Sequence, residues 1–278
     1  MTETTFIDGA VGKIAIHDLG GNDRETLLIA HATGFLGKVY QAFARELAND
    51  MRVIALDFRG HGDSDAPTTP ADFDWHGMAD DLARVIAHLS PSRLHAFGHS
   101  MGGAAVCEVE RSAPGTFTTA MVFEPIIPPG PFPGGSPLEM AARVRRATFP
   151  SHGHALERYA ARPPLGLFRA DVLHDYVHHG FRETEQGEIE LKCAPDSEAS
   201  TFSNAGKIRL SSLDEIELDV AVAVSGDGGL PAQLAAKVAQ QLPNGRLLEF
   251  PTVTHFGPLQ DPVIVADAMR GLITASRT

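Results

Sequence analysis

Short apolar runs alternate with amphipathic stretches along most of this 278-residue chain. The apolar runs predict strands near 13–18, 26–31, 52–57, 93–98, 119–124, 219–225 and 246–250. The amphipathic stretches predict helices near 38–48, 75–89, 101–112, 231–242 and 261–275. Alternation of this kind predicts an α/β fold, in which helices flank both faces of a mostly parallel central sheet.

The region from 128 to 218 interrupts this alternation. It opens with a proline- and glycine-rich connection at 128–135. Helical patterns then follow near 137–147, 153–161 and 169–180, whereas strand patterns are scarce. We therefore predict a core formed by residues 1–127 and 219–278, and a helical insertion at 128–218. A segment of this length without a function is uncommon.

Residues 98–102, Gly-His-Ser-Met-Gly, join a predicted strand to the helix that follows it. They match Gly-x-Ser-x-Gly, the nucleophile elbow, a tight strand-to-helix turn that exposes a serine. This turn strains the serine backbone, so the flanking residues must be small. Gly98, Gly102 and Gly103 meet that need. The pattern predicts Ser100 as a nucleophile.

A nucleophilic serine needs two partners. Because serine is a poor nucleophile at its own pKa, a histidine must take its proton. A carboxylate must in turn hold the tautomer of that histidine. His255 lies in a loop between the last predicted strand and helix, and we predict it as the base. Two carboxylates directly follow predicted strands and are candidates for the acid: Glu124 and Asp227.

Four segments carry a resemblance to a known family: residues 31–35, 57–64, 98–103 and 255–258. Through them the chain resembles the α/β-hydrolase superfamily over nearly its whole length. The resemblance implies the α/β-hydrolase fold and the chain order serine, acid, histidine. It also implies that the insertion is a helical cap (lid) over the active site. Such a cap would exclude water and shape the substrate pocket.

The resemblance bears on the choice of acid. In many members the acid follows the seventh strand as Gly-x-x-Asp, but here residues 226–229 read Gly-Asp-Gly-Gly. In a subset similar to haloalkane dehalogenases and some lactonases, it follows the sixth strand, about two dozen residues after the nucleophile. Glu124 lies at that place, at the end of a strand where an idle charge would be costly. We predict Glu124 as the acid and keep Asp227 as the alternative; its Asp-Gly sequence otherwise favours a turn.

The resemblance also implies two backbone N–H groups that bind an oxyanion. One belongs to Met101, directly after the nucleophile, and the other to Thr33, in the loop after an early strand. The family usually has glycine at the position of Ala32. The Thr33 hydroxyl is a further candidate donor. The turn at 57–64 is expected to be structural and to brace this loop.

Charge and composition exclude several classes of partner. A net charge of −12, from 23 basic and 35 acidic residues, argues against nucleic acid and against an anionic membrane surface. We see no signal peptide, no apolar run of membrane-spanning length and no disulfide framework, and we expect a cytoplasmic protein. His174 and His178 have a ligand spacing, but without a clear third ligand we predict no metal and no cofactor. The oligomeric state, including a homodimer, stays open.

Together these residues predict an enzyme that transfers an acyl group to water from a small-molecule substrate. The first prediction is a carboxylesterase or lactonase for small to medium apolar substrates. A thioesterase, a carbon–carbon bond hydrolase and a cofactor-free haloperoxidase or perhydrolase are alternatives on the same fold. A non-catalytic small-molecule receptor is the alternative from another class, although Ser100 together with His255 argues against it.

Overall fold

The computed structural model describes residues 3–22, 25–130 and 136–277. Within these residues, eight strands form one sheet in the order β1-β2-β4-β3-β5-β6-β10-β11. The strands are β1 (Glu3–Asp8), β2 (Lys13–Gly20), β3 (Thr26–Ala30), β4 (Arg52–Leu56), β5 (Leu94–His99), β6 (Thr119–Phe123), β10 (Val220–Ser225) and β11 (Gly245–Phe250). The β1–β2 and β2–β4 pairs are antiparallel and the others are parallel. The predicted α/β fold with a mostly parallel sheet is confirmed.

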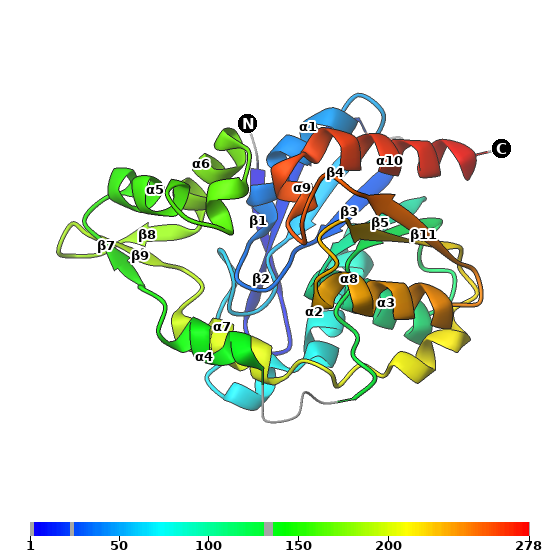
Figure 1. The fold of residues 1–278 in the computed structure, drawn as a ribbon, viewed down its shortest axis with the longest axis horizontal. Coiled ribbons are helices and arrows are strands. Elements are labelled where there is room, and N and C mark those ends of the chain that lie inside the picture. The colour runs from blue at the N-terminus through cyan, green and yellow to red at the C-terminus, as the bar shows by residue number, and fades with distance from the viewer. Residues whose placement is uncertain (1–2, 23–24, 131–135, 278) are drawn as a thin grey trace.

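Helices cover both faces of this sheet (Figure 1). They are α1 (Gln41–Leu47), α2 (Trp75–Leu89), α3 (Met101–Ser112), α8 (Leu230–Gln241), α9 (Gly257–Gln260) and α10 (Pro262–Ala275), with 3₁₀ turns η1 (Gly37–Tyr40) and η2 (Pro70–Phe73). Successive residues of β3, Leu27 and Leu28, belong to two different buried hydrophobic clusters. Because side chains alternate across a strand, these clusters lie on opposite faces. Every residue of β5, β6 and β10 is buried, as expected of strands covered on both sides.

Strand β1 is an element that the hydrophobic pattern did not predict. It lies at the edge of the sheet, and its residues are exposed or half-buried. An edge strand with little burial lacks the apolar alternation on which strand prediction depends.

Most of the insertion between β6 and β10 forms a lobe beside the main sheet, at the left of Figure 1, and its last 3₁₀ turn contacts α3 and α8. Its elements are α4 (Pro137–Arg143), β7 (Thr148–Phe149), α5 (His152–Ala160), η3 (Leu165–Leu167), α6 (Ala170–His179), β8 (Phe181–Glu183), β9 (Ile189–Leu191), α7 (Pro195–Ser203) and η4 (Leu210–Glu215). Part of the predicted connection at 128–135, residues 131–135, lies outside the described residues. The three predicted helices correspond to α4, α5 and α6.

The insertion is not helical throughout, which corrects the sequence prediction. Strands β7, β9 and β8 form a small antiparallel sheet in that order. Each has only two or three residues, too few to show a period-two pattern. The predicted helix near 137–147 ends at Arg143, just before this sheet begins. None of the described helices is long and apolar enough to cross a membrane.

Candidate active site

Ser100 occupies the sharp turn between β5 and α3. Its backbone has φ 56° and ψ −114°. A Cβ at Gly98 would lie 2.6 Å from the Cα of Gly103, and one at Gly102 would lie 2.0 Å from the carbonyl oxygen of Ala30. Only glycine therefore lets the strand, the turn and the helix approach this closely.

Positive φ angles mark this part of the molecule. Among the described residues, the non-glycine residues with positive φ are Ser90, Ser100 and Glu124. Ser90 ends helix α2, where a left-handed residue is common. Each such conformation costs on the order of 1–3 kcal/mol and persists only where the surrounding structure imposes it. Two of the three strained residues are thus the predicted nucleophile and the predicted acid.

Glu124 directly follows β6 and its side chain contacts His255. Glu124 Oε2 accepts a hydrogen bond from His255 Nδ1 at 2.7 Å, and Oε1 accepts one from Ser225 N at 2.8 Å. The Ser100 N–H donates to the carbonyl oxygen of Phe123, one residue before Glu124, at 2.9 Å. The structure therefore brings the loops that carry Ser100, Glu124 and His255 together at the carboxyl ends of neighbouring strands.

The contact with Glu124 sets the tautomer of His255. A carboxylate only accepts, so the Nδ1 atom carries a proton, and in the neutral ring Nε2 is then the atom with a lone pair. Glu124 is completely buried, whereas 17% of the His255 side chain is exposed. The imidazole thus has the Glu124 carboxylate on the buried side and an edge that solvent reaches.

Asp227, the alternative acid, lies near the same histidine but contacts its backbone. Asp227 Oδ2 accepts from His255 N at 3.3 Å, and Oδ1 accepts from Gly229 N at 2.8 Å and from Ser225 Oγ at 3.0 Å. Burial raises the pKa of Asp227, but the hydrogen bonds from Gly229, Ser225 and His255 outweigh it and hold the pKa below its usual range. Asp227 therefore holds the loop as a carboxylate, while the ring contact belongs to Glu124.

The two residues predicted to supply the oxyanion donors, Thr33 and Met101, contact each other through their side chains. Thr33 Oγ1 lies 3.4 Å from Met101 Sδ, and both residues are buried. The backbone N–H groups of Thr33 and Met101 donate to no acceptor among the described residues. Buried N–H groups without a partner are rare in proteins, which makes this pair available to a substrate oxygen. The Thr33 hydroxyl, by contrast, is directed at the sulfur.

A network of buried side chains braces the loop that carries Thr33. Asp57 accepts from Gly37 N at 2.6 Å, from Asp63 N at 2.7 Å and from His17 Nε2 at 2.8 Å. His31 Nδ1 donates to the carbonyl oxygen of Ala32, and His31 Nε2 accepts from Phe58 N. Burial lowers the pKa of His31 to about 3, so the ring is neutral and both bonds persist at neutral pH. The turn at 57–64 has the bracing contacts that the sequence predicted.

One group of described residues is close enough to hold a metal ion: His17, Asp57 and Asp63. Its ligand atoms are already engaged, because His17 binds Asp57 and the Asp63 carboxylate binds Lys38 and Lys192. The group is therefore better explained as part of the brace.

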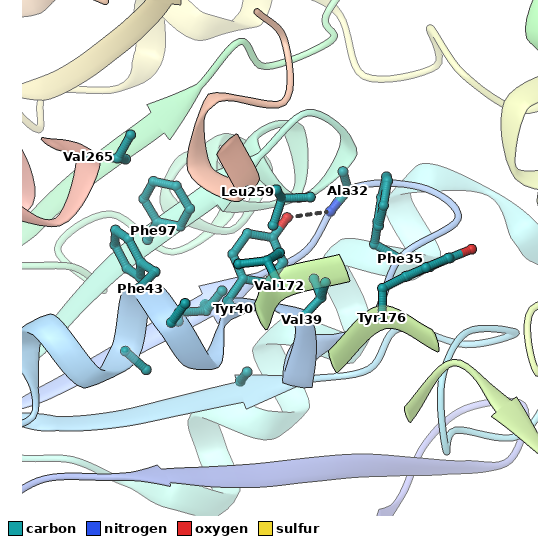
Figure 2. Packing of buried hydrophobic residues seen from close by; sticks show 14 of the residues in the cluster. Ala32, Phe35, Val39, Tyr40, Phe43, Phe97, Val172, Tyr176, Leu259 and Val265 are labelled. Carbon is teal, nitrogen blue, oxygen red and sulfur yellow. Dashed lines mark hydrogen bonds between the residues drawn. The ribbon is translucent and has the colours of Figure 1, made fainter. Parts of the chain in front are cut away.

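Aromatic rings connect the lobe to the loops of the site. Phe168 of the lobe packs 5.6 Å from Phe256 and 5.7 Å from Phe35, between ring centroids. Tyr176 of α6 packs 5.5 Å from Phe35, and Figure 2 shows these two rings side by side. Phe256 in turn follows His255 and contacts its ring. An apolar wall thus extends from the histidine into the lobe.

A part-buried ion pair in the lobe reaches the loop that carries Thr33. Arg145 Nη1 lies 2.7 Å from Glu198 Oε2, and Arg145 also contacts the Tyr176 hydroxyl. A Cβ at Gly34 would lie only 2.5 Å from Glu198 Oε1. Glycine at 34 therefore lets the Glu198 carboxylate rest against this loop. The sequence did not single out Glu198, because no local pattern connects positions so far apart in the chain.

Comparison with known proteins identifies the family of this chain. The family model described as the alpha/beta hydrolase family matches residues 27–268. A protein of Pantoea ananatis provisionally named carbamate hydrolase RutD is 25% identical over 256 residues, 86% of this chain and 85% of that protein. A non-heme chloroperoxidase of Streptomyces lividans is 28% identical over 220 residues, 75% of this chain and 76% of that one.

Solved structures show the same fold. The structure of an E-2-(acetamidomethylene)succinate hydrolase superposes with a TM-score of 0.82 at 17% identity, covering 99% of this chain and 100% of that one. The family match spans most of the chain, including the elbow and the loops that carry Thr33, Glu124 and His255. The chain therefore belongs to the α/β hydrolase family, and it is a hydrolase.

Proposed function

We propose that this protein cleaves an ester-type bond through a Ser100–His255–Glu124 triad and an acyl-enzyme intermediate. The observation that carries the proposal is the 2.7 Å contact between His255 Nδ1 and Glu124 Oε2, next to a serine on a strained elbow. Nucleophile, base and acid in this order form the arrangement that activates a serine hydroxyl.

The reaction proceeds in two steps. In the first, Ser100 Oγ attacks the carbonyl carbon while His255 Nε2 takes the hydroxyl proton. His255 then gives this proton to the leaving alcohol, and the acyl group stays on the serine. In the second step, a water molecule loses a proton to the same Nε2 atom and attacks the acyl-enzyme. The bond between the acyl carbon and Ser100 Oγ then breaks, His255 returns the proton to Oγ, and the carboxylic acid leaves. Glu124 keeps the Nδ1 proton in place and stabilises the imidazolium throughout.

The backbone N–H groups of Thr33 and Met101 stabilise the charge that develops on the carbonyl oxygen. Neither group has another acceptor among the described residues, which supports this role. Loss of one such donor lowers kcat by roughly a hundredfold to a thousandfold in other serine hydrolases.

The lobe is proposed to act as a cap that selects small to medium apolar acyl or alcohol groups. The aromatic wall formed by Phe35, Phe168, Tyr176 and Phe256 supports this substrate class, because it offers ring faces next to the histidine. Pockets for small molecules are mostly apolar and carry few polar groups.

Hydrolysis of a carbon–nitrogen bond is the second candidate function. It is favoured by the relative named as a carbamate hydrolase, which matches 86% of this chain. The same triad would then protonate an amine instead of an alcohol as the leaving group.

Release of p-nitrophenol from a series of p-nitrophenyl esters tests the first proposal, and p-nitrophenyl carbamates test the second. Ser100→Ala is expected to lower kcat by about a millionfold, as in comparable triads. Ser112→Ala, at the exposed far end of α3, is the matched control. A wild-type protein that neither releases p-nitrophenol nor reacts with a fluorophosphonate would exclude a serine hydrolase and favour the receptor.

A further inference from the structure

A buried chain of hydrogen bonds joins the three loops of the candidate site. Tyr40 Oη lies 3.4 Å from Ala32 N and 2.7 Å from His99 Nδ1. His99 Nε2 lies 2.9 Å from the carbonyl oxygen of His255. Tyr40 and His99 are both completely buried. Figure 2 shows the Tyr40 hydroxyl directed at the Ala32 nitrogen and surrounded by hydrophobic side chains.

The chemistry of these groups fixes the direction of each bond. The His255 carbonyl oxygen only accepts, so His99 Nε2 carries a proton and donates it. Burial and the neighbouring His255 ring hold the pKa of His99 well below its usual range, so the His99 ring is neutral and its Nδ1 atom accepts. Tyr40 therefore donates its hydroxyl proton to Nδ1, and its oxygen accepts from the Ala32 N–H. Burial also raises the pKa of Tyr40, which keeps the phenol protonated.

Each end of the chain lies at or next to a group of the proposed mechanism. Ala32 precedes Thr33, whose N–H is the proposed oxyanion donor. His99 precedes Ser100, and the last acceptor is the backbone of His255 itself. The bonds connect residues that are 8, 59 and 156 positions apart, so no single loop could supply this arrangement.

His255 is thus held at three atoms. Its N–H is held by Asp227, its carbonyl oxygen by His99 and its Nδ1 by Glu124. Among the hydrogen bonds of the described residues, its Nε2 atom has no partner. The contacts leave free only the atom that must exchange protons with Ser100 and the substrate.

We propose that Tyr40 and His99 are positioning residues that hold the oxyanion loop, the elbow and the base in one fixed arrangement. The inference rests on the proposed triad and adds two residues that do not touch substrate. Its consequence is kinetic, because a displacement of about 1 Å in a catalytic group can cost about a hundredfold in rate.

The test compares His99→Leu, His99→Gln and Tyr40→Phe, with Phe43→Leu as the matched control. Phe43 is a buried ring of the same hydrophobic cluster that lies outside the hydrogen-bonded chain. His99→Leu is expected to lower kcat for a p-nitrophenyl ester by about tenfold to a hundredfold with KM little changed. His99→Gln keeps a donor for the carbonyl and an acceptor for Tyr40, and should restore most of kcat.

Tyr40→Phe should also lower kcat. It provides the test of the network if His99→Leu does not fold. The double variant Tyr40→Phe with His99→Leu should be no slower than His99→Leu alone, since both remove one network. A merely structural role predicts instead that all variants, including Phe43→Leu, lose activity in proportion to their loss of thermal stability. That result, or a glutamine variant no faster than the leucine variant, would overturn the inference.

A second readout does not depend on turnover. The His255 Nδ1 proton, shared with Glu124, should give a far-downfield proton NMR signal. We expect this signal to shift or broaden in His99→Leu and Tyr40→Phe, and to stay unchanged in Phe43→Leu. An inactive wild-type protein whose signal responds in this way would refute the proposed function but keep the network. An active protein whose signal is unchanged in His99→Leu would keep the proposed function and refute the network.

Discussion

The core and the inserted lobe meet the candidate site through different kinds of contact. On the core side, the polar groups Asp57, His99 and Glu124 are completely buried and bonded to backbone atoms of neighbouring loops. On the lobe side, the contacts with the core include aromatic rings and part-exposed ion pairs. In the Arg45–Asp171 pair, for example, the two side chains are 56% and 44% exposed.

This difference in burial separates side chains that are held rigidly from side chains that can be substituted at little cost in stability. Loss of a buried hydrogen bond leaves a buried polar group unpaired, which costs on the order of 1–3 kcal/mol. An exposed ion pair contributes about 0–1 kcal/mol, because water screens it. The buried core contacts therefore fix the groups of the candidate site in place, whereas the exposed ion pairs of the lobe tolerate substitution. This division would suit a family in which the core carries a common reaction and the lobe selects a substrate specific to each member.

The largest effect should follow from removing the charge of the proposed acid. Glu124→Gln is expected to lower kcat by about ten-thousandfold, because the amide no longer holds the required His255 tautomer. Asp227→Asn, the matched variant, should lower kcat by less than about tenfold, since Asp227 contacts only the backbone of His255. Steady-state kinetics on a p-nitrophenyl ester measures both. The reverse order of effects would make Asp227 the acid.

Loss of a buried carboxylate in the brace should have the next largest effect, on stability. Asp57→Asn is expected to reduce the free energy of unfolding by about 3–5 kcal/mol, because it breaks the buried pair with His17. Urea unfolding followed by circular dichroism gives the value. Asp219→Asn, in an exposed ion pair with Arg246, provides the comparison and should change stability by less than about 1 kcal/mol. Equal effects for the two variants would remove the distinction between buried and exposed contacts.

Stability should also fall as the pH is lowered below neutrality. Burial lowers the pKa values of four core histidines: His31, His61, His95 and His99. In the unfolded chain a histidine takes up its proton near pH 6.5, whereas the folded protein takes it up only at lower pH, about 3 for His31. Between these two pH values the unfolded chain binds more protons than the folded protein. The contribution of the buried histidines to the free energy of unfolding is therefore complete above about pH 6.5 and is lost as the pH falls.

Urea unfolding between pH 8 and pH 4.5 measures this dependence. His174→Asn, in the lobe, should leave its slope unchanged, because the His174 side chain is 65% exposed. A free energy of unfolding that is constant across this range would contradict the neutral state of the buried histidines.

The smallest effect should come from the lobe. Lys192→Met removes an ion pair with Asp63 of the core, in which the side chains are 19% and 23% exposed. Because Lys38 still binds Asp63, stability should change by less than about 1 kcal/mol. We expect KM for long-chain esters to change by a few fold while kcat stays constant. Arg246→Met, far from the lobe, is the control. A large loss of kcat would show that the lobe contributes to the chemistry and not only to selection.

Local sequence patterns predicted the parts of the molecule whose signals lie within one segment. The core strands form short apolar runs because helices cover both faces, and the elbow is visible because its glycines must stand beside Ser100. The lobe was predicted less well. Its strands are too short for a period, and its Glu198 contact with Gly34 depends on residues 164 positions apart. Tyr40 gave no signal at all, because it lies inside a helical pattern and its partner His99 is 59 positions away.

The sequence by itself determined the fold class, the elbow and the two carboxylates that are candidates for the acid. It did so because periodicity, turn chemistry and strand ends are encoded by neighbouring residues. Only the tertiary structure decided which carboxylate contacts His255. Strands β6 and β10 are parallel neighbours, so Glu124 and Asp227 arrive at the same edge of the sheet. Which one reaches the imidazole depends on side-chain direction at the scale of a single hydrogen bond, and that direction is set by packing across the whole sheet.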